Sequence, residues 1–323
     1  MYRRLLDPRN DLVFKRVFGE HADILRAFLD AVLPLPPDGR IESLEYLTPE
    51  QTPEIPLLKN TIVDVRCRDQ QGRQFIVEMQ MNWTNAFMQR VLFNASKAYV
   101  RQLERSARYE LLEPVIGLSL LDDKFDQTSP AWFHHYKIVN VDRPERTIEG
   151  LELVFIELPK FHPGLAGSLL SAEGESWLRY LIETGDTSEG AVERLEREVA
   201  TTKELKMAVQ LAEESAFSRG LLVAYDNFWD IVRRERTLFG SAYDEGIEEG
   251  RKAGMEAGRA VGMEAGRVAG MEAGRVAGME AGRAAGMEAG IEEGKRAGMA
   301  LALQRLIAAG TPEAEARRLL GVN

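Results

Sequence analysis

Residues 61–81 read TIVDVRCRDQQGRQFIVEMQM, two mostly apolar runs separated by a short polar turn. The alternation of apolar and polar residues on both sides of the turn predicts the two antiparallel strands of a β-hairpin. Each run nevertheless carries an acid, Asp64 or Glu78, inside a strand that otherwise reads as buried. These acids need an explanation that a purely structural hairpin does not supply.

The turn decides which residues of the two strands face each other. The residues QQG before Arg73 suit a three-residue loop, a type I turn with Gly72 in the left-handed conformation. Such a loop pairs Asp69 with Arg73. Continuing the ladder from that pair places Asp64 directly opposite Glu78.

This register divides the hairpin into two faces. Asp64, Glu78 and Gln80 share one face, and the other is predicted to be the packed face, with Val63, Val65, Cys67, Phe75, Val77 and Met79. Two acids directly across a ladder have Cβ atoms about 5 Å apart and destabilise the sheet. Such a pair indicates a shared proton or a bound cation. The alternative is a solvated face on which both acids point into water.

A divalent cation is the better of the two explanations for a close acid pair. Carboxylate oxygens and water are the ligands that Mg²⁺ accepts, and it usually takes only one or two carboxylates from a protein. Gln80 stands beside the pair and could hold a water or a phosphate oxygen.

Composition limits the class of protein. The 323 residues are 45% hydrophobic and 28% charged, as in ordinary globular proteins. The sequence has no signal-peptide pattern and no apolar run of about 18 residues, so we expect a cytoplasmic protein without a membrane segment. A single cysteine, Cys67, excludes an internal disulfide and a multi-cysteine zinc site.

Charge is unevenly distributed along the chain. The net charge of −10 argues against general affinity for nucleic acid. Residues 1–110, however, contain 16 Lys+Arg and 15 Asp+Glu, a net charge of +1. The N-terminal part is therefore not repelled from a polyanion.

Further elements are predicted around the hairpin. The apolar spacing predicts helices at 10–33 and 85–108 and strands at 41–47, 114–121, 132–141 and 151–158, with Asn10 or Asp11 as the first helix cap. This order indicates an α/β or α+β domain of about 160 residues whose sheet is partly covered by helices. Residues 165–240 read as a helical region of mixed charge.

The predicted helix at 85–108 carries a row of cations. Their spacing of seven, four, four and three residues puts them along one stripe, and they are Arg90, Lys97, Arg101, Arg105 and Arg108. Such a stripe can hold the phosphate backbone of DNA, and Arg90 and Lys97 lie closest to the hairpin in sequence. The alternative is a solvated charged face. The apolar residues of this helix lie elsewhere and can pack on the sheet.

A glycine repeat occupies the C-terminal part of the chain. Every fourth residue from Gly246 to Gly298 is glycine, 14 in all, in units such as GMEAGRVA. Each glycine costs a helix roughly 1 kcal/mol relative to alanine, so only close helix contact could compensate. We expect a long helix over 241–300 that serves self-association or partner binding, with a flexible linker as the alternative. Residues 301–323 are predicted to form a terminal helical hairpin.

Several blocks of the sequence together resemble a known family. In order, over residues 5–162, they are DPRNDLVFKRVFG, FLDAVL, DVRCRD, IVEMQ, RVLFNASKAYVRQL and LELVFIELPKF. They resemble the Rpn family of recombination-promoting nucleases, also called PD-(D/E)xK family transposases. The resemblance implies a restriction-endonuclease-like core of a mixed sheet flanked by helices over residues 1–164, ahead of the C-terminal helical region and the glycine-repeat helix.

The resemblance also implies an activity. It is the Mg²⁺-dependent hydrolysis of DNA phosphodiester bonds, with Mn²⁺ as an alternative ion, in recombination or mobile-element movement. Asp64 and Glu78 would bind the metal and, with Gln80, form the catalytic set. Gln80 stands where the superfamily has lysine and cannot transfer a proton, so the metal-bound water must supply the nucleophile. Val63 replaces the proline of the motif, whose role is structural.

The candidate nucleic-acid contacts complete the prediction. Lys15 lies in the block that resembles the first helix of the family, so it joins Arg90, Lys97 and Arg101 as a candidate contact to DNA. An alternative function is a catalytically weak DNA-binding or assembly protein. In that case the repeat at 241–300 would do the main work by forming a homo-oligomer.

Overall fold

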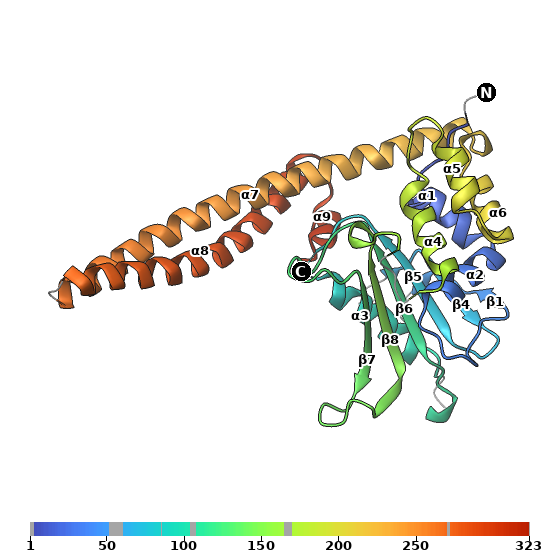
Figure 1. Ribbon diagram of the computed structural model, residues 1–323, viewed down its shortest axis with the longest axis horizontal. Helices are drawn as coiled ribbons and strands as arrows, with labels where there is room; N and C mark the ends of the chain where they lie inside the picture. The colour runs from blue at the N-terminus through green and yellow to red at the C-terminus, as the bar shows by residue number, and fades with distance from the viewer. Residues whose placement is uncertain are drawn as a thin grey trace. The chain divides into compact units, whose positions relative to one another are not determined.

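The computed structural model describes residues 3–51, 61–84, 86–103, 108–164, 170–269 and 272–322. These residues divide into two compact units. One unit comprises Met1–Trp83 and Phe87–Trp229, and the other comprises Thr84–Ala86 and Asp230–Asn323. Figure 1 shows the elements of both.

A mixed six-stranded sheet forms the centre of the first unit, with the strand order β1-β4-β5-β6-β8-β7. Its strands are β1 (Leu44–Tyr46), β4 (Val65–Asp69), β5 (Gln74–Gln80), β6 (Val115–Leu121), β7 (Phe133–Val139) and β8 (Thr147–Glu157). β5, β6 and β8 run parallel to one another, and the remaining neighbours are antiparallel. The helix α3 (Phe87–Val100) connects β5 to β6, as a parallel pair requires.

Helices cover both faces of this sheet (Figure 1). One face packs on α1 (Asp11–Phe14), the π-helical turn Lys15–Gly19, α2 (Ala22–Val32), α4 (Ala172–Glu183), α5 (Ala191–Glu198) and α6 (Lys203–Leu211). The ring of Trp177 on α4 lies 6.0 Å from that of Phe18 and 5.7 Å from that of Phe28. Helices α4, α5 and α6 therefore share one apolar core with the N-terminal helices.

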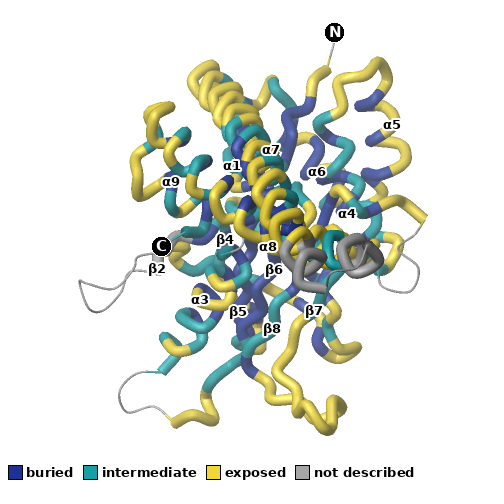
Figure 2. The backbone as a smooth tube through the Cα atoms, turned by 90° about the vertical axis from the view of Figure 1, so that its left-hand side faces the viewer, coloured by how far each residue is buried: buried dark blue, intermediate teal, exposed yellow. Residues whose placement is uncertain are grey.

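The other face of the sheet packs on α3. Two apolar clusters join this helix to the strands, one around Ile76, Ala95 and Ala98 and the other around Phe87 and Phe155. Figure 2 shows the resulting burial of β5 and β6 as dark blue segments. The fold is the restriction-endonuclease-like α/β architecture that the sequence predicts.

The hairpin forms in the predicted register. Val65 pairs with Val77 and Arg66 with Ile76. Gly72 has a φ of 88°, the left-handed conformation expected at the end of the turn. Beside it the N–H of Asp69 donates to the carbonyl oxygen of Arg73 at 3.0 Å, which confirms the predicted turn pair.

Two features of the hairpin differ from the prediction. The first strand is interrupted at 63–64, and β3 (Thr61–Ile62) pairs with β2 (Glu50–Gln51) in a separate sheet, so the predicted ladder with β5 does not continue through β3. Val63 packs in the cluster under α3, opposite to its predicted face. The face that carries Glu78 is also packed, because β5 has a parallel neighbour and parallel strands are usually covered on both sides.

The predicted helices are shorter in the structure. Asn10 caps α1 by accepting a hydrogen bond from the N–H of Leu12 at 3.0 Å, as predicted, but the helix expected at 10–33 is divided by the π-helical turn. The helix expected at 85–108 ends at Val100. The predicted contact Arg105 lies outside the described residues.

Helices make up the second unit. α7 (Arg219–Ala269), which begins in the first unit, is followed by α8 (Glu272–Ala308) and α9 (Glu313–Leu320). In Figure 1, α7 and α8 run side by side along the glycine repeat. The single long helix expected at 241–300 is therefore two antiparallel helices in the described residues.

The glycines of the two helices face each other. A Cβ atom on Gly250 would lie 1.9 Å from the carbonyl oxygen of Gly290, and one on Gly246 would lie 2.3 Å from that of Gly294. The backbones are thus too close for any larger residue. This close contact offsets the cost of glycine in a helix. Self-association through the repeat stays a prediction.

In the part of the chain that the structure describes, no helix is both long and apolar enough to cross a membrane.

Candidate active site

The two acids of the hairpin lie where β4 begins and β5 nears its end. Because Val65 pairs with Val77, the next step along the two strands sets Asp64 opposite Glu78. Asp64 lies just outside β4, and its Oδ2 accepts a hydrogen bond from the N–H of Met79 at 2.8 Å. That bond attaches the Asp64 carboxylate to β5 beside Glu78.

Burial dominates the electrostatics of Asp64 and raises its pKa to about 7. The Met79 N–H lowers this pKa, whereas the carboxylates of Glu78 and Asp11 raise it and the Lys15 ammonium lowers it. Asp64 is thus poised between its neutral and charged forms near neutral pH.

Glu78 lies deeper, with 8% of its surface exposed. Burial raises its pKa, and the charge of Arg90 and a hydrogen bond from Asn94 act in the opposite direction. Asn94, on α3, donates from Nδ2 to Oε1 of Glu78 at 2.9 Å. The site therefore contains two acids that burial disfavours as anions, which a proton or a cation would stabilise.

Two neutral oxygens near Glu78 lack a hydrogen-bond partner. They are Oδ1 of Asn94 and Oγ of Ser119, both buried. Ser119 is the β6 partner of Glu78 in the parallel ladder, so the two side chains leave the sheet on the same face. Buried polar atoms are rarely left without a partner, so these two oxygens are open to a water or another ligand.

Sequence reasoning missed Asn94 and Ser119, although a signal was present. Asn94 interrupts the buried row of α3 next to Ala95, and Ser119 interrupts the apolar strand VIGLSLL. A polar residue in a buried row needs a partner. Identifying that partner requires knowing that α3 lies over β5 and β6.

The amide of Gln80 is bonded at both ends. Its Nε2 donates to the carbonyl oxygen of Asn82 at 2.8 Å, and its Oε1 accepts from the guanidinium of Arg90 at 2.6 Å. The Arg90 guanidinium also lies over the ring of Phe87, 4.8 Å from its centroid. The structure thus joins two of the predicted site residues, Gln80 and Arg90.

A second group of cations lies toward the other end of α3. Lys97 and Arg101 of the predicted stripe are joined there by Arg66 of β4, which sequence reasoning did not single out. Burial and then the charge of Arg101 lower the pKa of both Arg66 and Lys97. Arg66 donates to Oε1 of Gln74 at 2.8 Å, and its Nε is buried without a partner. The positive charge of Arg101 thus repels those of Arg66 and Lys97, and a bound anion would reduce this repulsion.

Lys15 lies on the other side of Asp64. Its Nζ is 2.9 Å from Oδ1 of Asp11, and it begins the π-helical turn, a feature frequent at functional sites. A Cβ on Gly19 would lie 3.7 Å from the Cβ of Lys15 and 3.8 Å from Val65, which shows how closely the turn approaches β4. The Lys15 ammonium therefore lowers the pKa of Asp64, while its own charge is paired with that of Asp11.

The acid pair supplies only two protein carboxylates. Among the described residues, no group of three or more His, Cys, Asp or Glu side chains could hold a metal ion. Mg²⁺ does not need such a group, because it retains several waters and is commonly bound through one or two carboxylates together with substrate phosphate.

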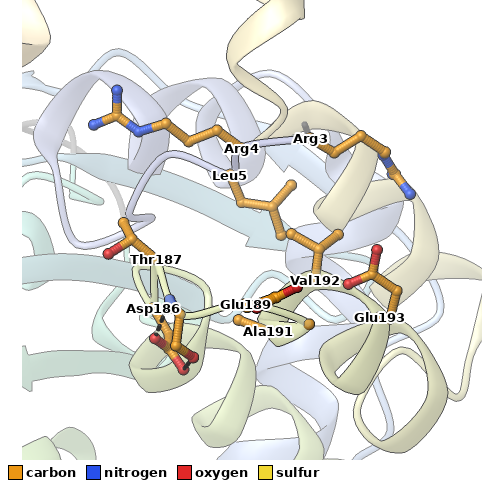
Figure 3. Close-up of a pocket in the computed structure, with 11 residues that line it drawn as sticks. Arg3, Arg4, Leu5, Asp186, Thr187, Glu189, Ala191, Val192 and Glu193 are labelled. Carbon is orange, nitrogen blue, oxygen red and sulfur yellow. Dashed lines mark hydrogen bonds between the residues drawn. The ribbon is translucent and has the colours of Figure 1, made fainter. Parts of the chain in front are cut away.

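A cavity of about 180 Å³ lies elsewhere in the first unit, between the N-terminal segment and residues 186–193, which form the loop before α5 and its first turn (Figure 3). Its Arg3 pairs with Glu196 and Glu213, and its Arg4 with Glu214. The charges of both arginines are thus matched by acids of the chain. The cavity contains neither member of the acid pair.

A mixed sheet between helices, with facing acids on a central hairpin, defines the class of restriction-endonuclease-like nuclease folds. Residues 8–232 match the family model of the PD-(D/E)XK nuclease family transposases, and the chain belongs to this family. The match confirms the resemblance seen in the sequence blocks. Searches of curated proteins and of solved structures gave no match.

Proposed function

We propose that this protein is a divalent-metal-dependent DNA endonuclease that acts in recombination or in the movement of mobile elements. The observation that carries the proposal is the facing pair of acids, half-buried Asp64 and buried Glu78, both with a raised pKa. Two carboxylates held together in a poorly solvated place favour a cation between them. The chain belongs to a nuclease family, so we infer that the cation takes part in hydrolysis of phosphodiester bonds.

The residues present fit a hard divalent cation. All the available donors are oxygens: the two carboxylates and the partnerless Oδ1 of Asn94 and Oγ of Ser119. Oxygen donors select Mg²⁺ or Mn²⁺ over softer metals. Asp64 and Glu78 would hold the ion, and we take Mg²⁺ as the first choice because the described residues offer it a pair of carboxylates and no larger cluster.

The chemistry then divides between the ion and the chain. A bound divalent cation supplies a water of lowered pKa and offsets negative charge that develops on the phosphate. Met79 holds the Asp64 carboxylate and Asn94 holds that of Glu78, so both ligands are oriented before substrate binds. This matches the general pattern in which neighbouring hydrogen bonds orient metal ligands.

The cations of α3 and β4 support DNA as the substrate. Arg66, Lys97 and Arg101 gather on the α3 side of the sheet, the side that Glu78 also faces. Phosphate contacts of this kind position a nucleic acid without reading its sequence. RNA offers the same phosphates, and the same assay with RNA as substrate tests that alternative.

Nicking of supercoiled plasmid DNA tests the proposal. We expect the wild-type protein to nick in Mg²⁺ and to lose activity in EDTA. Asp64→Asn and Glu78→Gln preserve size and should reduce nicking to background, because each removes one charged ligand.

Glu149→Gln is the matched control, because Glu149 is an exposed acid at the start of β8. Its nicking rate should equal that of wild type. Equal nicking by wild type and both site variants would refute the assignment of the site. DNA binding without nicking in any divalent metal would favour the assembly alternative instead.

A further inference from the structure

A glutamine at position 80 leaves the acid pair without the positive charge that a lysine there would provide. We propose that Arg90, reaching over from α3, supplies this charge to the reacting phosphate, and that Gln80 serves as its anchor instead of binding the attacking water. The inference rests on the proposed nuclease function and adds a catalytic residue to it.

The hydrogen bonds of Gln80 support the role of an anchor. The amide is clamped between the carbonyl of Asn82 at 2.8 Å and the guanidinium of Arg90 at 2.6 Å. A glutamine that positions a water must present a donor or acceptor to it. Here one N–H of the amide holds the chain after β5, and one lone pair of its oxygen holds Arg90, so both ends are fixed in place by the protein.

The spacing of α3 matches the spacing of β5. Glu78 and Gln80 are two residues apart on one face of β5, a separation of roughly 6.6 Å along a strand. Arg90 and Asn94 are four residues apart on one face of α3, a separation of roughly 6 Å along a helix. Asn94 bonds to Glu78, and Arg90 bonds to Gln80. The helix therefore lies along the strand with two hydrogen bonds between them, spaced alike on both elements. Both positions are therefore set by the same packing.

Arg90 already acts on one member of the acid pair, Glu78. Its charge is the strongest of the influences that lower the pKa of Glu78. The ring of Phe87 beneath its guanidinium fixes the side chain further. A cation held by packing and by a hydrogen bond requires little rearrangement when charge develops nearby, which is how preorganised groups accelerate reactions.

The chemistry of arginine defines what this residue does. A guanidinium stays charged at any physiological pH, so Arg90 stabilises negative charge on the phosphate and takes no proton. Its planar fork suits phosphate oxygens. Lys15 is less suited to the task, because its ammonium is joined to Asp11 at 2.9 Å, whereas the Arg90 guanidinium contacts Gln80, two positions from Glu78 on the same strand.

Removing the charge at position 90 and placing one at position 80 tests the inference. We expect Arg90→Ala to lower the plasmid nicking rate at saturating Mg²⁺ by roughly 100-fold, the usual cost of removing one preorganised stabilising group. The double variant Gln80→Lys with Arg90→Ala should recover at least a tenth of the wild-type rate. Gln80→Lys alone should gain nothing, because the new ammonium meets Arg90.

Arg143→Ala is the control, since Arg143 lies exposed in the turn between β7 and β8. DNA binding is measured separately by fluorescence anisotropy with Ca²⁺ in place of Mg²⁺. There we expect Arg90→Ala to stay within about threefold of wild type, because other cations hold the backbone.

Three results would overturn the inference. They are an Arg90→Ala variant that nicks as fast as Arg143→Ala, a double variant no faster than Arg90→Ala, and a loss of DNA binding as large as the loss of nicking. Failure of the wild-type protein to nick at all would be distinct from these. It would refute the nuclease function, and the inference with it.

Discussion

At the scale of single residues, Asp64 links the stability of the fold to pH. Its pKa in the folded chain is raised to about 7 by burial, against about 3.9 for an unperturbed aspartate. Between these values the folded state binds more protons than the unfolded state. The free energy of unfolding therefore falls as pH rises from about 4 to about 7, and the raised pKa of Glu78 acts in the same direction.

Thermal unfolding in EDTA across this pH range measures whether the free energy of unfolding falls as the pH rises. Wild type should lose stability between about pH 4 and about pH 7, whereas Asp64→Asn should lose less and become the more stable protein above about pH 7, by about 1–3 kcal/mol. The asparagine can still accept the hydrogen bond from Met79. Glu149→Gln should follow wild type, and parallel curves for wild type and Asp64→Asn would contradict the raised pKa.

The site residues differ in how far the sequence alone could identify them. Asp64 and Glu78 were predictable because the turn at Gly72 fixes the register, and a register sets residues opposite each other without any knowledge of the rest of the fold. Asn94 and Ser119 were not predictable in their roles. Asn94 reaches Glu78 only because α3 lies over the sheet, and Ser119 lies beside Glu78 only because β6 pairs with β5.

At the scale of secondary-structure elements, the glycine repeat is explained by contact between two helices. Gly250 and Gly290 approach so closely that a methyl group on either would overlap the backbone of the other helix. Gly240 lies on the same helix α7 as Gly250, but a Cβ there would meet nothing within 4 Å. A substitution at Gly240 therefore reports helix propensity alone, and one at Gly250 reports the contact between the two helices.

Substitutions at these two glycines should act in opposite directions. Gly240→Ala should stabilise α7 by up to about 1 kcal/mol through helix propensity alone. Gly250→Ala should loosen the contact between α7 and α8, with hydrogen exchange at residues 246–258 and 286–298 increasing by at least tenfold. Unchanged exchange in Gly250→Ala would show that the two helices are not held in this contact.

For the whole molecule, the net charge of −10 opposes DNA binding, so the local cations have to determine it. Each phosphate contact contributes about 0.9 to the slope of log affinity against log salt concentration. Lys97→Ala should therefore reduce that slope by about one, as should Arg66→Ala.

Fluorescence anisotropy with a duplex oligonucleotide in Ca²⁺, at several salt concentrations, measures this slope. Arg143→Ala is again the control and should leave the slope at its wild-type value. Identical slopes for Lys97→Ala and Arg143→Ala would remove Lys97 from the DNA contact surface.

The family match and the first unit end at nearly the same residue. The match covers residues 8–232, and the first unit ends at Trp229. The glycine-repeat hairpin lies beyond the match, so family membership assigns it no role. Its use in self-association remains a prediction to be tested on the full chain.

The sequence by itself determined the hairpin, its register, the acid pair and the family, because turns and strand ladders depend on residues close together in the chain. It also predicted the sheet between helices from the order of its apolar patterns. Tertiary structure alone decided that α3 sets Asn94 on Glu78 and Arg90 on Gln80, and that the glycine stripe folds back on itself. These contacts join residues whose spacing in the chain carries no sign of their meeting, since only the packing of one element on another brings them together.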